Sequence, residues 1–157
     1  EDANNPAALF ADDGSLLLAF RDRDLHMGIA TAPLYHGPYT VHDFDLFPDI
    51  KLEDMFLFRQ DDGVHMICED NRAQISGHER WGVHLFSEDG ISNWRKTDPL
   101  VIYDHDILWE DGTRLTATRR ERPQLLCDDE GVITHLATGV LADGHAWNHM
   151  QPVTLTS

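Results

Sequence analysis

The chain has 157 residues, of which 41% are apolar and 25% are charged, and this is enough for one globular domain with a buried core. Its net charge of −16 argues against nucleic acid as a partner, because phosphate groups would be repelled. The apolar runs are too short to cross a bilayer, so we expect no membrane partner.

Three segments of the chain align with one another without gaps. Each has a polar pair, a short apolar run, an acidic turn with glycine, and a second apolar run. Gly14, Gly63 and Gly131 occupy the same column, and glycine adopts the positive φ that tight turns need. The pattern therefore predicts three β-hairpins. The segments are NNPAALFADDGSLLLAF (4–20), EDMFLFRQDDGVHMICE (53–69) and ERPQLLCDDEGVITHLA (121–137).

Further strands are predicted after the first two hairpins, at 25–32, 39–44, 81–87 and 99–104. No stretch has a sustained apolar period of 3.6, so we expect an all-β chain with almost no helix. Four short antiparallel strands in about 50 residues are typical of a β-propeller blade. We predict one partial propeller domain over 1–157, and a β-sandwich is the alternative. The predicted blades are 4–50, 51–105 and a partial blade at 119–157.

Two blades and part of a third are too few for a closed ring, since propellers typically have about four to eight blades. We expect either that the chain is a piece of a longer protein or that a second copy completes the ring. The first residues have no basic leader and no apolar h-region, which is typical of a mature or truncated product. The sequence does not determine the compartment, and a secreted or periplasmic location is compatible with it.

In order and spacing, these motifs resemble the five-bladed β-propeller glycoside hydrolases, the group around family 43. The resemblance extends over nearly all of the chain, which would be about half of such an enzyme. Met55 stands where that group usually has proline, and Asn4 and Asn5 stand where it has aspartate. The segments that resemble it are 4–41, LEDMFLFRQDDGVHMI (52–67), WGVHLFSEDGISNW (81–94) and RRERPQLLCDDEGVITHLATGVL (119–141).

The resemblance implies hydrolysis of a glycosidic bond by a base, a pKa modulator and an acid. Glu121 corresponds to the general acid and Asp54 to the modulator, with Glu53 as a hydrogen-bond acceptor for substrate. Glu53 and Asp54 could exchange roles, because Glu53 shares the alignment column of Glu121. The base would come from a blade before residue 1 or from another chain. The alternative for Glu121 is a structural salt bridge with Arg119 or Arg122.

The remaining substrate-binding candidates are Asn5, His84, Arg119 and Arg122. Asn5 could contact sugar hydroxyls, although a capping role in a turn explains Asn4 and Asn5 equally well. No metal centre and no cofactor are predicted, because the acidic turns lack EF-hand spacing and no zinc motif is present. A central calcium ion is compatible with the predicted fold but has no support in the sequence.

Three other functions are compatible with the sequence. The first is a non-catalytic module that binds carbohydrate, and the second is an interaction module that pairs through its open sheet edges. The third is a phosphorylase in which Arg119, Arg120 and Arg122 bind phosphate. The predicted partners are thus an oligosaccharide or glycoside and, for ring closure, a second copy. We also expect Trp94 to pack under its turn, and Cys68 and Cys127 to be small core residues.

Overall fold

The computed structural model describes residues 3–153, and this part of the chain is all-β and contains no helix. It therefore has no helical segment that is long and apolar enough to span a membrane. The strands form two four-stranded antiparallel sheets, a three-stranded sheet and a two-stranded hairpin. They are β1 (Asn4–Phe10), β2 (Leu16–Arg21), β3 (Met27–Ala32), β4 (Thr40–Asp43), β5 (Leu52–Gln60), β6 (Gly63–Asp70), β7 (Trp81–Ser87), β8 (Arg95–Tyr103), β9 (Asp106–Leu108), β10 (Arg114–Thr116), β11 (Arg119–Cys127), β12 (Ile133–Ala142) and β13 (His145–Pro152).

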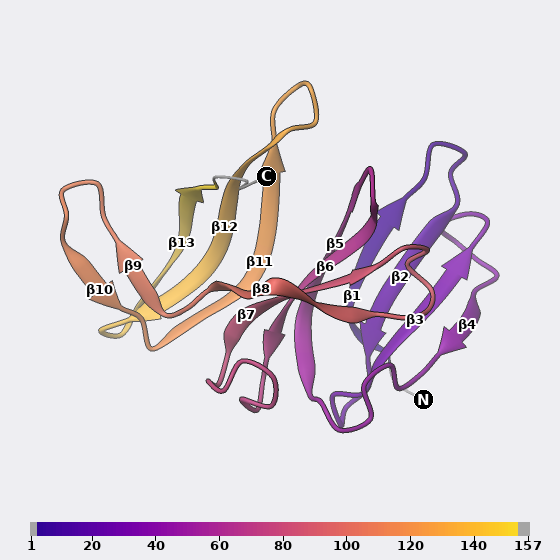
Figure 1. The fold of residues 1–157 in the computed structure, drawn as a ribbon, viewed down its shortest axis with the longest axis horizontal. Helices are drawn as coiled ribbons and strands as arrows, with labels where there is room; N and C mark the ends of the chain where they lie inside the picture. The colour runs from indigo at the N-terminus through magenta and orange to yellow at the C-terminus, as the bar shows by residue number, and fades with distance from the viewer. Residues whose placement is uncertain (1–2, 154–157) are drawn as a thin grey trace.

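Within each sheet, every strand pairs with the next one in the chain, so the strand order is sequential. The β1–β4 and β5–β8 sheets lie within the ranges 4–50 and 51–105 and have the four strands that the sequence predicts for each. The β11–β13 sheet has three strands in the described residues. Figure 1 shows the three sheets side by side in chain order, with the β9–β10 hairpin outermost. β1 packs against β5, and β5 packs against β11.

All three predicted hairpins are confirmed. The first and third have the same turn: the Ala11 N–H donates to the Ser15 carbonyl at 2.8 Å, and the Asp128 N–H donates to the Val132 carbonyl at 3.0 Å. The second turn is tighter, because Gln60 pairs directly with Gly63, the glycine of the shared alignment column. Two further hairpins, β9–β10 and β12–β13, were not predicted.

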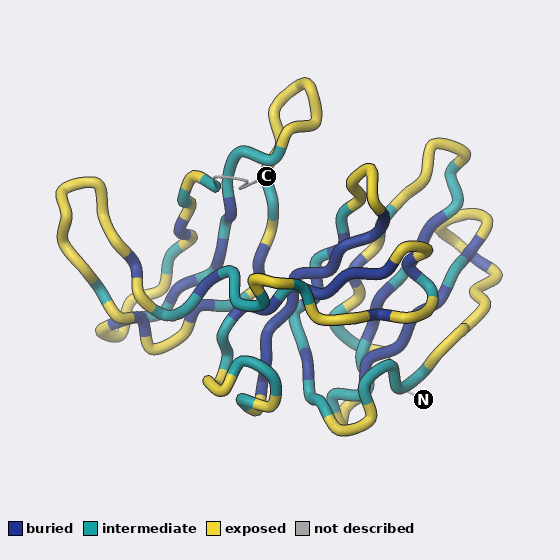
Figure 2. Tube along the Cα trace, in the orientation of Figure 1, coloured by how far each residue is buried: buried dark blue, intermediate teal, exposed yellow. Residues whose placement is uncertain are grey.

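The main core lies between the β1–β4 and β5–β8 sheets, and Figure 2 shows the strand centres buried and the turns exposed. Trp94 is buried at its edge, and its indole N–H donates to the Gly90 carbonyl at 3.2 Å, as predicted. Cys68 is a core residue, also as predicted. The prediction is wrong for Cys127, which is exposed because it ends β11 at the turn.

Candidate functional site

The first strands of the three larger sheets, β1, β5 and β11, each begin with a β-bulge in the same alignment column. The pairing register shifts between Asn4 and Ala7 in β1, between Glu53 and Phe56 in β5, and between Glu121 and Gln124 in β11. The first of the two residues inside each bulge has positive φ: 46° at Asn5, 53° at Asp54 and 59° at Arg122. A bulge bends its strand and redirects the side chains beside it.

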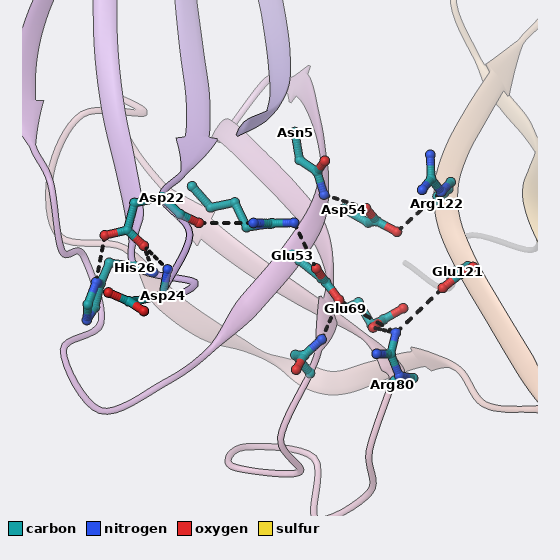
Figure 3. A network of polar contacts seen from close by, with 12 residues as sticks. Asn5, Asp22, Asp24, His26, Glu53, Asp54, Glu69, Arg80, Glu121 and Arg122 are labelled. Atoms are coloured by element: carbon teal, nitrogen blue, oxygen red, sulfur yellow. Dashed lines mark hydrogen bonds and ion pairs between the residues drawn. The ribbon is translucent and has the colours of Figure 1, made fainter. Parts of the chain in front are cut away.

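These three strand starts meet, and their polar side chains form one cluster (Figure 3). The Asn5 side-chain amide donates to Asp54 Oδ1 at 2.8 Å, which joins β1 to β5. Arg122 Nε lies 3.8 Å from Asp54 Oδ2, which joins β11 to β5. The structure thus brings five predicted residues together, and Arg119 adjoins them through a contact of 3.9 Å with Glu121 Oε2. The five are Asn5, Glu53, Asp54, Glu121 and Arg122.

Asp54 lies at the centre of this polar cluster, with only 9% of its side chain exposed. Burial raises the pKa of Asp54, and the charges of Glu53 and Glu121 act in the same direction, against the opposing charge of Arg122. A carboxyl group with a raised pKa among other carboxylates is typical of acid–base sites, and here the group with the raised pKa is Asp54, the residue predicted to be the modulator.

Glu69, at the end of β6, is a member of the cluster that the sequence patterns did not reveal. It pairs with Glu53 across the β5–β6 ladder, and its side chain is 0% exposed. Burial raises the pKa of Glu69 to about 8, against the opposing charge of Arg80 and with support from the other carboxylates of the cluster. The available signal was the position of Glu69 directly after the apolar run 66–68, where a charged side chain needs a partner.

Arg80 is the second missed residue, and it is the basic centre of the cluster. Its Nη1 lies 2.9 Å from Glu69 Oε1 and 3.6 Å from both Glu53 Oε1 and Glu121 Oε2. The loop that carries Arg80 is held by Asp70, whose carboxylate accepts hydrogen bonds from the backbone N–H groups of residues 74–76. These bonds, with that of the Ser76 hydroxyl, lower the pKa of Asp70 despite its burial. Asp70 therefore positions the loop and does not belong to the cluster.

The three arginines of 119–122 have different surroundings. Arg119 and Arg122 remain at the rim, with 49% and 74% of their side chains exposed. Arg120 is buried at 2% exposure and donates to the Asp104 carbonyl at 3.2 Å and to Thr138 Oγ1 at 3.1 Å. Arg120 therefore links the chain after β8 to the third sheet. Unlike Arg119 and Arg122, it is not exposed to a ligand.

His84 is not brought to the cluster. Its Nε2 lies 2.9 Å from His65 Nδ1, and its ring stacks with Phe58. It lines a cleft of about 670 Å³ that also borders Leu125 and Leu136 of the third sheet. Burial lowers the pKa of His84 to about 4, and the charge of His65 acts in the same direction. The neutral imidazole is therefore the form that this packing favours.

Two groups in the described part of the chain place potential cation ligands within 4.8 Å of one another: Asp22, Asp24 and His26, and Asp54, Glu69 and Glu121. In the first group, Asp22 accepts hydrogen bonds from its own loop and from the His26 ring. In the second group, the Arg80 guanidinium already supplies a positive charge to two of the carboxylates. These contacts occupy some of the oxygens of each group, while Glu69 Oε2 is buried without a hydrogen-bond partner among the described residues.

A scan against protein-family models finds no match, and neither does a search of curated proteins. The resemblance to propeller glycoside hydrolases therefore stays a prediction that rests on the motifs.

Proposed function

We propose that the chain forms blades of a five-bladed β-propeller and that its carboxylate cluster hydrolyses a glycosidic bond. The observation that carries this proposal is the meeting of three bulged strand starts, which brings Asp54 and Glu121 oxygens within 4.8 Å of each other. Convergent carboxylates with differing surroundings are what acid-catalysed glycoside hydrolysis needs.

In this proposal Glu121 is the general acid and Asp54 is the modulator that keeps a second charge close to it. Glu53, Asn5, Arg119 and Arg122 bind substrate hydroxyl or acidic groups, and the exposed Arg122 lies at the outer rim. His84 has no part in this proposed site, because its ring contacts His65 and Phe58 and not the cluster. The base that activates water is supplied by further blades or by a second copy.

The test is a hydrolysis assay after the mass in solution has been measured by light scattering. We expect a dimer of twice the 17.9 kDa chain mass, and release of reducing sugar from a panel of arabinosides, galactosides and oligosaccharides. Glu121→Gln should abolish turnover while the fold is kept. The matched control is Glu130→Gln, which removes an exposed carboxylate from the turn of the same sheet. Equal turnover by Glu121→Gln and the wild type would overturn the assignment.

The second candidate is a non-catalytic carbohydrate-binding module derived from such a propeller. The observation that favours it is the pairing of the cluster carboxylates with arginines, since Glu53, Glu69 and Glu121 all lie within 3.6 Å of Arg80 Nη1. Structural ion-pair networks have this arrangement as well. Saturable oligosaccharide binding without release of reducing sugar would favour this candidate over the enzyme.

A further inference from the structure

A cleft of about 670 Å³ between the second and third sheets has no role in the proposed function. Its walls are mainly apolar and include Phe58 and Val101 of the second sheet and Leu125 and Leu136 of the third. Its volume lies within the range of about 300–1,000 Å³ that is usual for sites that bind small molecules. The cleft lies beside the end of β5, whereas the carboxylate cluster gathers at the start of this strand, so the two are separate sites.

A chain of hydrogen bonds leads from the surface to this cleft through Asp62, His65 and His84. His65 Nε2 lies 2.9 Å from Asp62 Oδ1, and His65 Nδ1 lies 2.9 Å from His84 Nε2. The Asp62 side chain is exposed and that of His65 is buried, while His84 lines the cleft. The hydrogen bond with His65 lowers the pKa of Asp62, so the first group of the chain is an ionised carboxylate.

The carboxylate sets the order of donors and acceptors along this chain. Because a carboxylate only accepts, His65 donates from Nε2, and a neutral imidazole that donates from Nε2 accepts at Nδ1. His84 then donates from Nε2, and its Nδ1 remains an acceptor without a hydrogen bond to a described residue. Burial lowers the pKa of His84 to about 4, so this ring is neutral at neutral pH. His84 thus offers a ligand an acceptor and not a donor.

The lining residues that carry a charge at neutral pH are both acidic. They are Asp62 and Asp98, and neither forms an ion pair with a lysine or arginine among residues 3–153. Arg95 and Lys96 line the neighbouring cleft instead, where the Arg95 guanidinium lies 4.6 Å from the centre of the Phe86 ring. An anionic ligand would therefore be repelled, and a cation with N–H donors would be attracted.

We propose that this cleft binds an organic amine with an apolar body. The body packs between the apolar walls of the second and third sheets, and the ammonium group donates a hydrogen bond to His84 Nδ1 beside Asp62 and Asp98. Asp62 and His65 are positioning residues, because they act on the ligand through the proton on His84 Nε2. This inference does not rest on the proposed hydrolysis.

The test is an NMR titration of the full chain at about pH 8, where an alkylammonium group stays charged. The probes are tryptamine, tryptophol and indoleacetate, which share an apolar body and differ in carrying an ammonium, a hydroxyl or a carboxylate group. We expect saturable binding of tryptamine that shifts the ring nitrogens of His84, and no binding of indoleacetate. Tryptamine should bind about tenfold more tightly than tryptophol, because its hydrogen bond is charge-assisted. Without a ligand, proton–nitrogen correlation spectra should show the proton of His84 on Nε2.

Two variants separate the acceptor from the charge. His84→Phe keeps a ring but removes the acceptor, so it should weaken tryptamine binding about tenfold. The matched control is His145→Phe, which changes an exposed histidine outside the cleft and should bind as the wild type does. Asp98→Asn, at an exposed position, should weaken tryptamine about threefold and leave tryptophol unchanged, and it decides the matter if His84→Phe does not fold.

Three results would overturn the inference. They are a lack of saturable tryptamine binding at millimolar concentrations, equal or tighter binding of tryptophol or indoleacetate, and a proton on Nδ1 of His84 in the free protein. Unchanged tryptamine binding in a folded His84→Phe protein would overturn it as well. A failure of the glycosidase assay has no bearing on these titrations, so the two proposals can fail separately.

Discussion

The side-chain amide of Asn5 donates a hydrogen bond of 2.8 Å to Asp54 Oδ1, across 49 positions of sequence. Each residue occupies the bulge of the first strand in its sheet, and each has a positive φ. This contact joins the first two sheets at the point where the carboxylates gather. It uses a residue type that tolerates left-handed backbone better than most others.

Two substitutions of Asn5 distinguish the contribution of this hydrogen bond to stability from the contribution of the left-handed backbone conformation. Asn5→Gly removes the amide but accepts a φ of 46°, so we expect a loss of about 1 kcal/mol in the free energy of unfolding. Asn5→Ala should lose about 1 kcal/mol more, because alanine is strained there. Chemical denaturation measures both losses. In a double-mutant cycle with Asp54→Ala, a coupling energy of zero would contradict the role given to this hydrogen bond.

Glu69 should make the protein less stable as the pH rises. Its pKa is raised from the ordinary 4.5 to about 8, so its contribution is fully present below pH 4.5 and is lost as the pH rises toward 8. Glu69→Gln should match the wild type at pH 4.5 and exceed it at about pH 8.5, since each pH unit between the folded and unfolded pKa of Glu69 corresponds to about 1.4 kcal/mol. Denaturant unfolding at the two pH values tests this. A wild-type advantage at the higher pH would contradict the prediction.

The contribution of His84 to stability should have the opposite pH dependence and decrease as the pH falls. Its pKa is lowered from the ordinary 6.5 to about 4, so the stability that it contributes is present above pH 6.5 and is lost as the pH falls toward 4. His84→Gln, which cannot titrate, should reduce the fall in melting temperature over this range. The control is the exposed His36→Gln. Parallel wild-type and His84→Gln curves would show that this imidazole does not titrate as proposed.

Gly82 should not tolerate a methyl group. A Cβ at this position would lie 2.0 Å from Cε1 of the buried Tyr103 ring, so Gly82→Ala should cost more than about 2 kcal/mol or displace β8. Gly139→Ala is the control, since a Cβ there would have the Glu121 carbonyl oxygen as its nearest neighbour at 3.6 Å, an ordinary contact. Thermal unfolding of the two variants distinguishes them, and equal melting temperatures would contradict the prediction.

Much of the fold could be predicted from local patterns. Acidic turns with glycine at one column located three hairpins, because turn geometry depends on a few adjacent residues. The β9–β10 hairpin escaped prediction although its turn also contains Asp111 and Gly112, since its strands have only three residues each. The third strands were located at 25–32 and 81–87, close to the observed β3 and β7.

The candidate site was only partly predictable. Asn5, Asp54 and Glu121 lie in the aligned polar pairs, so their convergence followed from the repeat. Glu69 and Arg80 lie outside the pairs and reach the cluster through strand pairing and a loop, which depend on long-range contacts. His84 lies on an apolar strand whose pattern does not indicate which cleft the ring will face.

The three bulges have the same backbone geometry but carry side chains of different chemistry. The same backbone position is filled by an amide at Asn5, a carboxylate at Asp54 and a guanidinium at Arg122. None of the three has a partner residue in its ladder, since the register shift skips each of them. Exchanging these side chains among residues that accept left-handed backbone would therefore alter the charge of the cluster while leaving strand register intact. The fold thus offers the same backbone position three times, and a single substitution at any of them would change the polar groups of the cluster.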